Sequence, residues 1–109
     1  RKLLDAYFGE GFAIDENLEL ECLRIPHFYR AFYVYKYATG LSAAIALSQR
    51  VLKGGAKELN QYLGFMQGGS SKWSLELLKG AGVDMTKPAP IEAAMQRFGE
   101  LVDELDELL

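Results

Sequence analysis

Apolar residues recur at helical spacing through most of this chain, and this pattern limits the possible fold more than any other feature. In three segments they recur at the three- to four-residue spacing of one helix face, in the first of them with Ser48 at the i+7 position, and a glycine or proline lies at a boundary of each segment. The residues concerned are Leu41, Ala44, Ile45 and Val51, then Leu59, Tyr62, Leu63 and Met66, then Ile91, Ala94, Met95, Phe98, Leu101, Val102, Leu105 and Leu108. The spacing predicts an all-α fold of several helices.

Glycine, proline and small polar residues predict where these helices end. Gly9 and Gly11 end a first helical segment, and a short helix follows over residues 16–23. Glycine pairs at 54–55 and 68–69 delimit a helix over 56–66, and Ser70 or Ser71 is expected to cap a short helix that stops at Gly80 and Gly82. The last helix, over about 90–109, is amphipathic, so we expect it to dock along its whole length.

Size, charge and cysteine content exclude several classes of protein. A chain of 109 residues is expected to form one compact domain, and its net charge of −3 with no clustered Lys and Arg argues against nucleic acid as a partner. No apolar run approaches the roughly 20 residues that a membrane span needs, so no membrane contact is expected. Cys22 is the single cysteine, which rules out an internal disulfide and favours a reducing, cytoplasmic location.

The stretch from 27 to 37, HFYRAFYVYKY, gathers aromatic residues densely. It holds six of the thirteen aromatic residues, four of the six tyrosines and the single histidine. Its last six residues alternate in period two, so a strand is open for them alone. The Ala- and Leu-rich segment that follows, up to the glycine pair at 54–55, favours a helix instead. We therefore predict one long helix over about 27–53.

On that helix the aromatic side chains form two stripes. One stripe consists of Tyr29, Tyr33 and Tyr37 and is predicted to line a cleft. The other consists of Phe28, Phe32 and Tyr35 and is predicted to belong to the core. Arg30 and Lys36 are interpreted as solvated cations, either of which could meet a peptide carboxylate. Each buried phenol would need a hydrogen-bond partner, so a core alone does not account for four neighbouring tyrosines.

The chain lacks the short motifs that would identify a complete catalytic site. HExxH, GxSxG, the P-loop and GxGxxG are all absent, and one histidine with one cysteine makes a poor catalytic pair. A hydrolytic zinc site commonly takes two histidines and a carboxylate. His27 alone cannot supply that set.

Two blocks of the sequence do resemble a known family. RIPHFYRAFYVYKYATG and the later LGFMQGGSSKWSLELLKGAGVDMTKPAPIEAAMQRF resemble the C-terminal part of the catalytic domain in the oligoendopeptidase F group. This group belongs to the zinc metallopeptidase family that includes thimet oligopeptidase. The resemblance covers essentially the whole chain. It implies that residues 1–109 are a helical segment of a larger zinc oligopeptidase, with the HExxH helix and the glutamate ligand lying upstream.

The resemblance also implies roles for the aromatic stretch. Such enzymes use a histidine and tyrosines from this region to hold the substrate and to donate hydrogen bonds to the oxyanion. By position, His27 and Tyr33 would be catalytic, while Tyr29, Tyr37 and Tyr35 would contact substrate. Here the histidine is followed at once by Phe28, whereas related enzymes place a glycine-rich loop there. A second register therefore stays open, in which Phe28, Phe32 and Tyr35 align and Tyr35 alone offers a hydroxyl.

These implications lead to expectations about partners. The chain should bind no metal by itself and cleave no peptide alone, because zinc would be held by the rest of the parent domain. Its partners would be short peptide substrates and that remaining part, and an apolar face left exposed should make the isolated chain prone to self-association. The alternative is a non-catalytic helical domain that binds a peptide or partner helix through its aromatic stripe.

Overall fold

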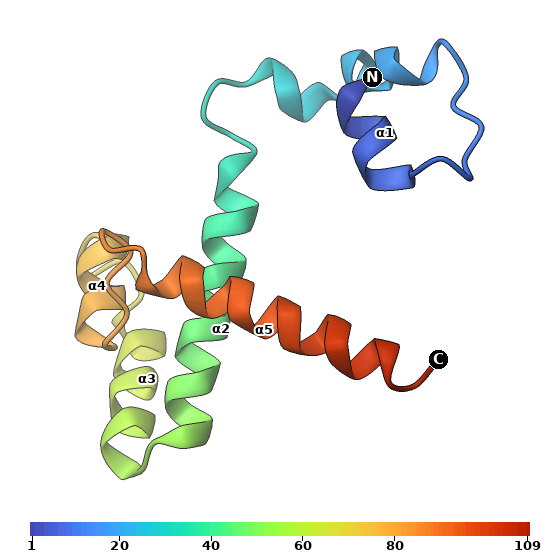
Figure 1. Ribbon diagram of the computed structural model, residues 1–109. Helices are drawn as coiled ribbons and strands as arrows, with labels where there is room; N and C mark the ends of the chain where they lie inside the picture. The colour runs from blue at the N-terminus through green and yellow to red at the C-terminus, as the bar shows by residue number, and fades with distance from the viewer. The chain divides into compact units, whose positions relative to one another are not determined.

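The computed structural model describes all 109 residues, which form helices and connecting turns without a β-strand (Figure 1). The all-α prediction is therefore confirmed. The chain divides into two compact units, Arg1–Tyr35 and Lys36–Leu109. The helical elements in chain order are α1 (Lys2–Phe8), the 3-10 helices η1 (Leu18–Arg24) and η2 (Pro26–Tyr29), α2 (Tyr35–Lys53), α3 (Ala56–Gly68), α4 (Ser74–Gly80) and α5 (Ala89–Asp106).

The first unit consists of short helices joined by turns. Gly9 ends α1 with a φ of 70°, a conformation that glycine adopts without strain, and its N–H donates to the Asp5 carbonyl at 3.1 Å. Phe8 and Phe12 stack across this turn with ring centroids 4.5 Å apart. None of the three helical elements contains a buried residue. The unit is therefore held by turns and surface contacts, such as that of the Arg1 amino group with Glu19, rather than by a core.

The long helix predicted from residue 27 begins only at Tyr35. Pro26 starts the short helix η2 instead, after Ile25 takes the extended conformation that a following proline favours. Arg30 is extended, and Phe32 has a φ of 57°, which a helix does not allow. The predicted pair of helical stripes is consequently not formed. Phe32, assigned to the core, is 89% exposed, and Phe28 is exposed as well.

The glycine signals in the second unit were interpreted correctly. α2 ends at Lys53 before the glycine pair, and α3 ends at Gly68, followed by Gly69 with a φ of 51°. α4 ends at Gly80 as predicted, but neither Ser70 nor Ser71 caps it. Its N-cap is Trp73, whose N–H donates to the Glu76 carboxylate at 3.3 Å. Ser70 and Ser71 lie before this position, because α4 begins only at Ser74 and the Ser71 N–H closes a preceding turn to the Gly68 carbonyl.

A small core lies where α2, α3 and the end of α4 meet. Its buried residues are Leu47, Ala81 and Val83. Partly buried hydrophobic side chains pack around them: Ala46, Tyr62, Phe65, Leu78 and Met85. The two-residue connection at 54–55 makes α3 fold back along α2 (Figure 1), and α4 packs on α3.

The side chain of Arg50 forms hydrogen bonds with the other parts of this core. Arg50 on α2 donates from Nε to the Ala81 carbonyl at 3.2 Å and from Nη2 to the Gln61 side-chain oxygen on α3 at 3.0 Å. Gly82 follows with a φ of 84°, and a Cβ there would lie 2.4 Å from the Arg50 guanidinium carbon. The turn after α4 therefore requires glycine both for its backbone conformation and for the close approach of Arg50.

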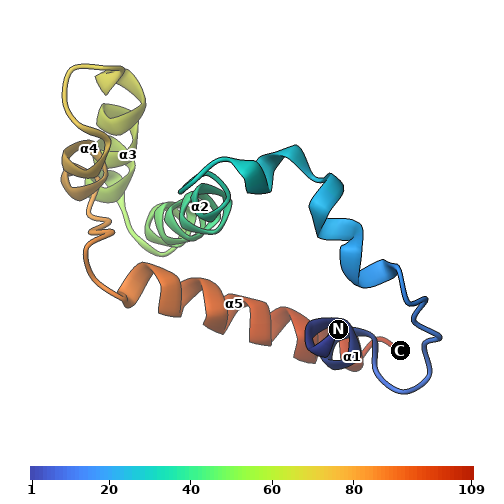
Figure 2. The same ribbon diagram turned by 90° about the horizontal axis from the view of Figure 1, so that it is seen from above.

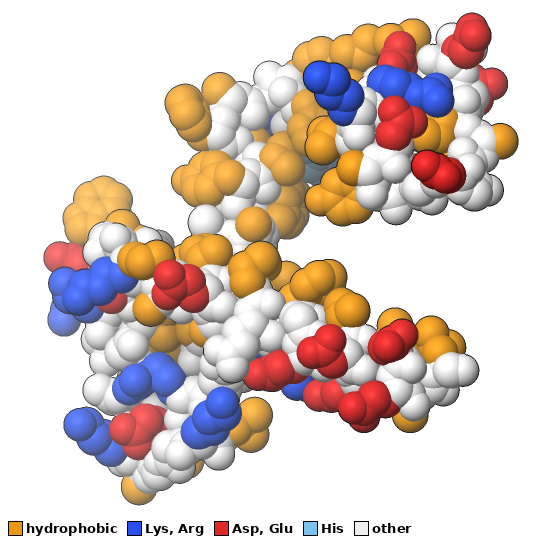
Figure 3. Space-filling model, viewed as in Figure 1, with side chains coloured by type: hydrophobic (Ala, Val, Ile, Leu, Met, Phe, Trp, Pro, Cys, Tyr) orange, Lys and Arg blue, Asp and Glu red, His pale blue; other side chains and the backbone are white.

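Helix α5 packs only through its first turns. Pro90 and Ala94 are buried, whereas Met95 and Phe98 farther along are 62% and 65% exposed. Beyond these turns α5 extends away from α2, which Figure 2 shows from a second direction. Docking along the whole helix was therefore wrongly predicted for this chain, because no other element of the unit reaches the later turns. Figure 3 shows hydrophobic and acidic side chains on different sides of α5.

None of the helices has both the length and the continuous apolar character that crossing a membrane would require.

Replacing an exposed glycine in a helix interior is expected to stabilise the second unit. Gly64 lies within α3, and an added Cβ would meet nothing within 4 Å. Gly64→Ala should raise the free energy of unfolding by about 0.5–1 kcal/mol, because alanine loses less backbone entropy in a helix. Chemical denaturation of this chain measures the change. A lower stability would mean that the fold does not tolerate a methyl group at this position.

Candidate functional site

The predicted catalytic pair is brought together by two consecutive tight turns in the first unit. The Arg30 N–H donates to the His27 carbonyl at 3.4 Å, and the Tyr33 N–H donates to the Arg30 carbonyl at 3.3 Å. The chain reverses over these residues, so the rings of His27 and Tyr33 lie with centroids 5.7 Å apart and planes tilted by 40°. The contact arises from a turn and not from neighbouring positions on a helix.

Four residues line a small cavity beside this ring pair. Its volume is about 230 Å³, and its walls are formed by Pro26, His27, Arg30 and Tyr33. The guanidinium carbon of Arg30 lies 5.6 Å from the centroid of the Tyr33 ring, within range of a cation–π interaction. An imidazole, a phenol and a guanidinium therefore face one space, which we call the His27–Tyr33 cavity.

The other three tyrosines are not brought to this cavity. The Tyr29 hydroxyl donates to the Leu23 carbonyl, which directs its side chain back toward η1. Tyr35 and Tyr37 lie in the first turn of α2 and are exposed, and the Lys36 amine is 5.4 Å from the Tyr37 ring centroid. Tyr29 and Tyr33 therefore do not form the predicted i, i+4 stripe, because helical geometry is absent between them.

Arg30 is the site residue whose place the sequence analysis did not anticipate. It was interpreted as a solvated cation that could meet a peptide carboxylate; it is exposed, as expected, and it also lines the His27–Tyr33 cavity. One sequence signal was available: no Asp or Glu occurs within four positions of Arg30. On a helix or tight turn, such neighbours are the usual partners of an exposed arginine.

The residues present do not fit a zinc site. The structure contains no group of three or more His, Cys, Asp or Glu side chains placed to hold a metal ion. His27 is the single histidine of the chain, and a catalytic zinc commonly takes three protein ligands. Any zinc linked to this fold would need ligands from outside these residues.

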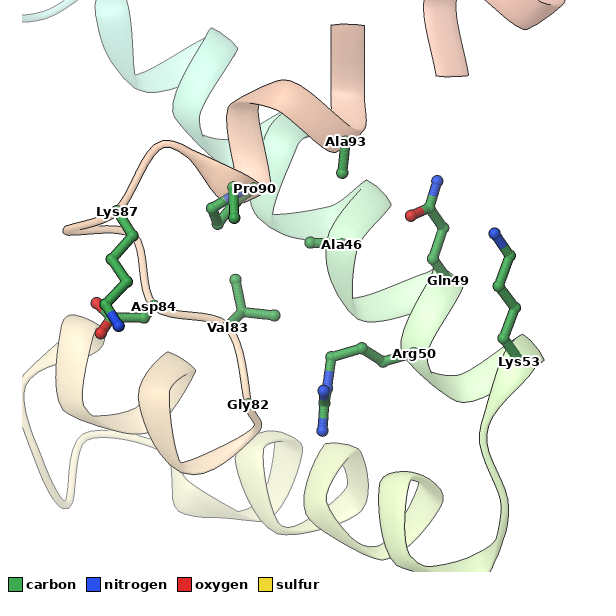
Figure 4. A pocket seen from close by; sticks show the side chains of 11 residues that line it. Ala46, Gln49, Arg50, Lys53, Gly82, Val83, Asp84, Lys87, Pro90 and Ala93 are labelled. Atoms are coloured by element: carbon green, nitrogen blue, oxygen red, sulfur yellow. The ribbon is translucent and has the colours of Figure 1, made fainter. Parts of the chain in front are cut away.

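A larger cavity lies in the second unit, between α2, the turn after α4 and the start of α5 (Figure 4). Its volume is about 490 Å³, and Val83, Pro90 and Ala93 supply an apolar wall. Asp84 is its one acidic lining residue. Hydrogen bonds from the Thr86 hydroxyl and N–H, with Lys79 at 3.4 Å, lower the pKa of the Asp84 carboxyl below its ordinary value.

That electrostatic environment makes Asp84 a poor general base. A carboxylate that accepts two hydrogen bonds and lies near an ammonium group is weakly basic, whereas efficient proton transfer needs a pKa near the working pH. The larger cavity offers no histidine, cysteine or tyrosine in addition. The smaller His27–Tyr33 cavity therefore carries the groups that are suited to transition-state chemistry.

Comparison with known proteins identifies a family and several relatives. The model of peptidase family M3 matches residues 1–97. The chain is 54% identical over 103 residues to the oligopeptidase PepF of Bacillus subtilis, a match that covers 94% of this chain and 15% of that protein. It is 42% identical over 106 residues to an oligoendopeptidase F homolog of Borreliella burgdorferi, covering 97% of this chain and 18% of the relative.

A third protein is also similar to this chain. An oligoendopeptidase F homolog of Lactococcus lactis is 39% identical over 114 aligned residues, covering 97% of this chain and 19% of that protein. The chain thus spans less than a fifth of the length of these relatives. No solved structure matches. The match of the family model over nearly the whole chain, together with identities of this size, shows that the chain belongs to peptidase family M3.

Proposed function

We propose that this chain is part of a zinc-dependent oligopeptidase that hydrolyses short peptides, and that it supplies substrate and oxyanion contacts but no metal ligands. The observation that carries the proposal is the meeting of His27 and Tyr33 at one cavity, with ring centroids 5.7 Å apart. The relatives support the reaction class, since their names describe oligopeptidases and oligoendopeptidases. Zinc would be held by residues outside this chain, in an upstream part of the same catalytic domain.

The chemistry assigned to this cavity is electrostatic. As the scissile carbonyl carbon is attacked, its oxygen gains negative charge, and a hydrogen-bond donor already in place stabilises that charge without reorganisation. The Tyr33 hydroxyl is a hydrogen-bond donor on a rigid ring. His27 is assigned the neighbouring position, where an imidazole N–H can donate to the same oxygen or to the substrate backbone. Tyr29, Tyr35 and Tyr37 remain proposed substrate contacts.

The exposed surface of the chain is consistent with a fragment of a larger domain. Apolar side chains on the later turns of α5 are exposed, as are several aromatic side chains of the first unit. We propose that the rest of the parent catalytic domain covers them, and that the isolated chain self-associates through them. Cys22 is free and exposed, which fits the proposed cytoplasmic location.

Peptide hydrolysis and metal dependence test the proposed function. The whole polypeptide should cleave a quenched fluorescent peptide of about ten residues, lose this activity when a chelator removes its metal, and regain it when zinc is added. The 109-residue chain alone should neither cleave the peptide nor bind zinc with sub-micromolar affinity, since it lacks a set of ligands. Activity that persists in the metal-free polypeptide would contradict the zinc assignment, and tight stoichiometric zinc binding by the short chain would contradict the division of roles.

A further inference from the structure

We propose that Arg30 binds a carboxylate group of the peptide substrate at the His27–Tyr33 cavity and so determines which peptides are preferred. This inference rests on the proposed function, because it assigns a substrate-recognition role to a residue of the same site. It goes further by naming the chemical group that is recognised and the residue that recognises it.

The first support comes from the partners of the five arginines. Arg1 pairs with Asp5, Arg24 with Glu21, and Arg97 with Glu100 and Glu104. Arg50 is held by a backbone carbonyl and the Gln61 side chain. Arg30 differs from all of them, because no carboxylate of the chain lies within 4 Å of it. Its positive charge is therefore available to an anion from outside the chain.

The second support is that Arg30 is held beside the Tyr33 ring by a contact that occupies no carboxylate of the chain. Its guanidinium lies over the Tyr33 ring, with the carbon 5.6 Å from the ring centroid. This contact with the ring face leaves the N–H groups at the edge of the guanidinium able to donate. A planar guanidinium binds a carboxylate with two parallel hydrogen bonds, so an arginine whose position is already restricted by a neighbouring ring loses less entropy when it does so.

The third support is the size of the cavity. At about 230 Å³ it is smaller than the ~300–1,000 Å³ that encloses a whole small ligand. It therefore accepts one end or one side chain of a peptide, with the remainder extending outside. A carboxylate reaches Arg30 from two sources, the C-terminal α-carboxylate of a short peptide or the side chain of an Asp or Glu.

The experiment compares matched peptides on the whole polypeptide. One peptide ends in a free carboxylate, a second has the same sequence with a C-terminal amide, and a third is the amide with a glutamate in place of a glutamine near the cleaved bond. We expect kcat/KM to be about tenfold higher for at least one carboxylate-bearing peptide than for its neutral match, with the difference in KM. Which peptide shows it identifies the source of the carboxylate.

Two variants of Arg30 and one matched control complete the test. Arg30→Gln should abolish the tenfold preference, and Arg30→Lys should keep part of it because the charge remains. Arg24→Gln removes an arginine of the same unit that is paired with Glu21 and should keep the full preference. Since Arg30 is exposed, its variants should melt at the wild-type temperature.

The outcomes separate this inference from the proposed function. A wild-type enzyme that cleaves all three peptides equally well overturns the role of Arg30 and leaves the peptidase assignment intact, and this comparison needs no variant to fold. A preference that survives in Arg30→Gln overturns it too. A polypeptide that cleaves none of the peptides contradicts the proposed function itself.

Discussion

Tyr33→Phe in the whole polypeptide is expected to lower kcat about 100-fold and to leave KM nearly unchanged. The change removes one hydroxyl and keeps the ring, so the contacts with His27 and Arg30 are preserved. A donor that acts on charge developing in the transition state contributes to kcat and not to ground-state binding. The loss corresponds to about 2.7 kcal/mol of transition-state stabilisation, which is typical of one oxyanion donor. Steady-state kinetics on a fluorogenic peptide measures it.

Tyr35→Phe is the matched control, because it removes the same group two residues away in the first turn of α2. It should change kcat less than threefold if Tyr33 is the donor. The opposite result, with Tyr35→Phe inactive and Tyr33→Phe fully active, would support the second register considered for this stretch. If neither variant affects kcat, the aromatic stretch has a structural role and its catalytic assignment is wrong.

Gly82→Ala should lower the free energy of unfolding of the second unit by about 3 kcal/mol. The backbone at this position has a φ of 84°, which costs a residue with a Cβ roughly 1–2 kcal/mol. The new Cβ would lie 2.4 Å from the Arg50 guanidinium carbon, so the arginine must move and weaken its bonds to Ala81 and Gln61. Hydrogen bonds from a charged donor contribute about 1.5–3 kcal/mol. Urea denaturation followed by circular dichroism measures the loss.

The nearby Gly80→Ala provides the control for this prediction. Gly80 is the last residue of α4, and a Cβ there would meet nothing within 4 Å. Its replacement should change stability by less than about 1 kcal/mol. Combining Gly82→Ala with Arg50→Ala separates the two causes, since the clash disappears and the backbone strain stays. Equal losses for Gly80→Ala and Gly82→Ala would show that neither the φ nor Arg50 restricts this turn.

The sequence predicted helix positions well where short-range chemistry decides them. Gly9 and Gly69 have positive φ and follow α1 and α3, as expected for glycines that end helices. The apolar spacing over α2, α3 and α5 likewise identified segments that are helical. These features depend on residues within one or two turns of each other, so a local pattern contains the information.

The aromatic stretch shows where local reasoning failed. Residues 27–34 have helical neighbours on one side and were assigned to the same helix, but Phe32 has a φ of 57° and residues 30–33 form a tight turn. No glycine marks this turn. The contact that accompanies it, between the rings of His27 and Tyr33, joins side chains six positions apart, a spacing at which helical residues do not face each other. The resemblance therefore predicted that His27 and Tyr33 belong to one site, but the turn that brings their rings together was not predicted.

By itself the sequence determined the helical class, most helix ends, the lack of a zinc ligand set within the chain and the residues worth testing. These follow from spacing, residue type and count, which need no knowledge of distant contacts. The tertiary structure alone decided that His27, Arg30 and Tyr33 share a cavity, that Arg50 closes the turn at Gly82, and that most of α5 stays exposed. Each of these depends on which groups the turns bring within a few ångströms of one another, and several backbone paths fit the same local preferences.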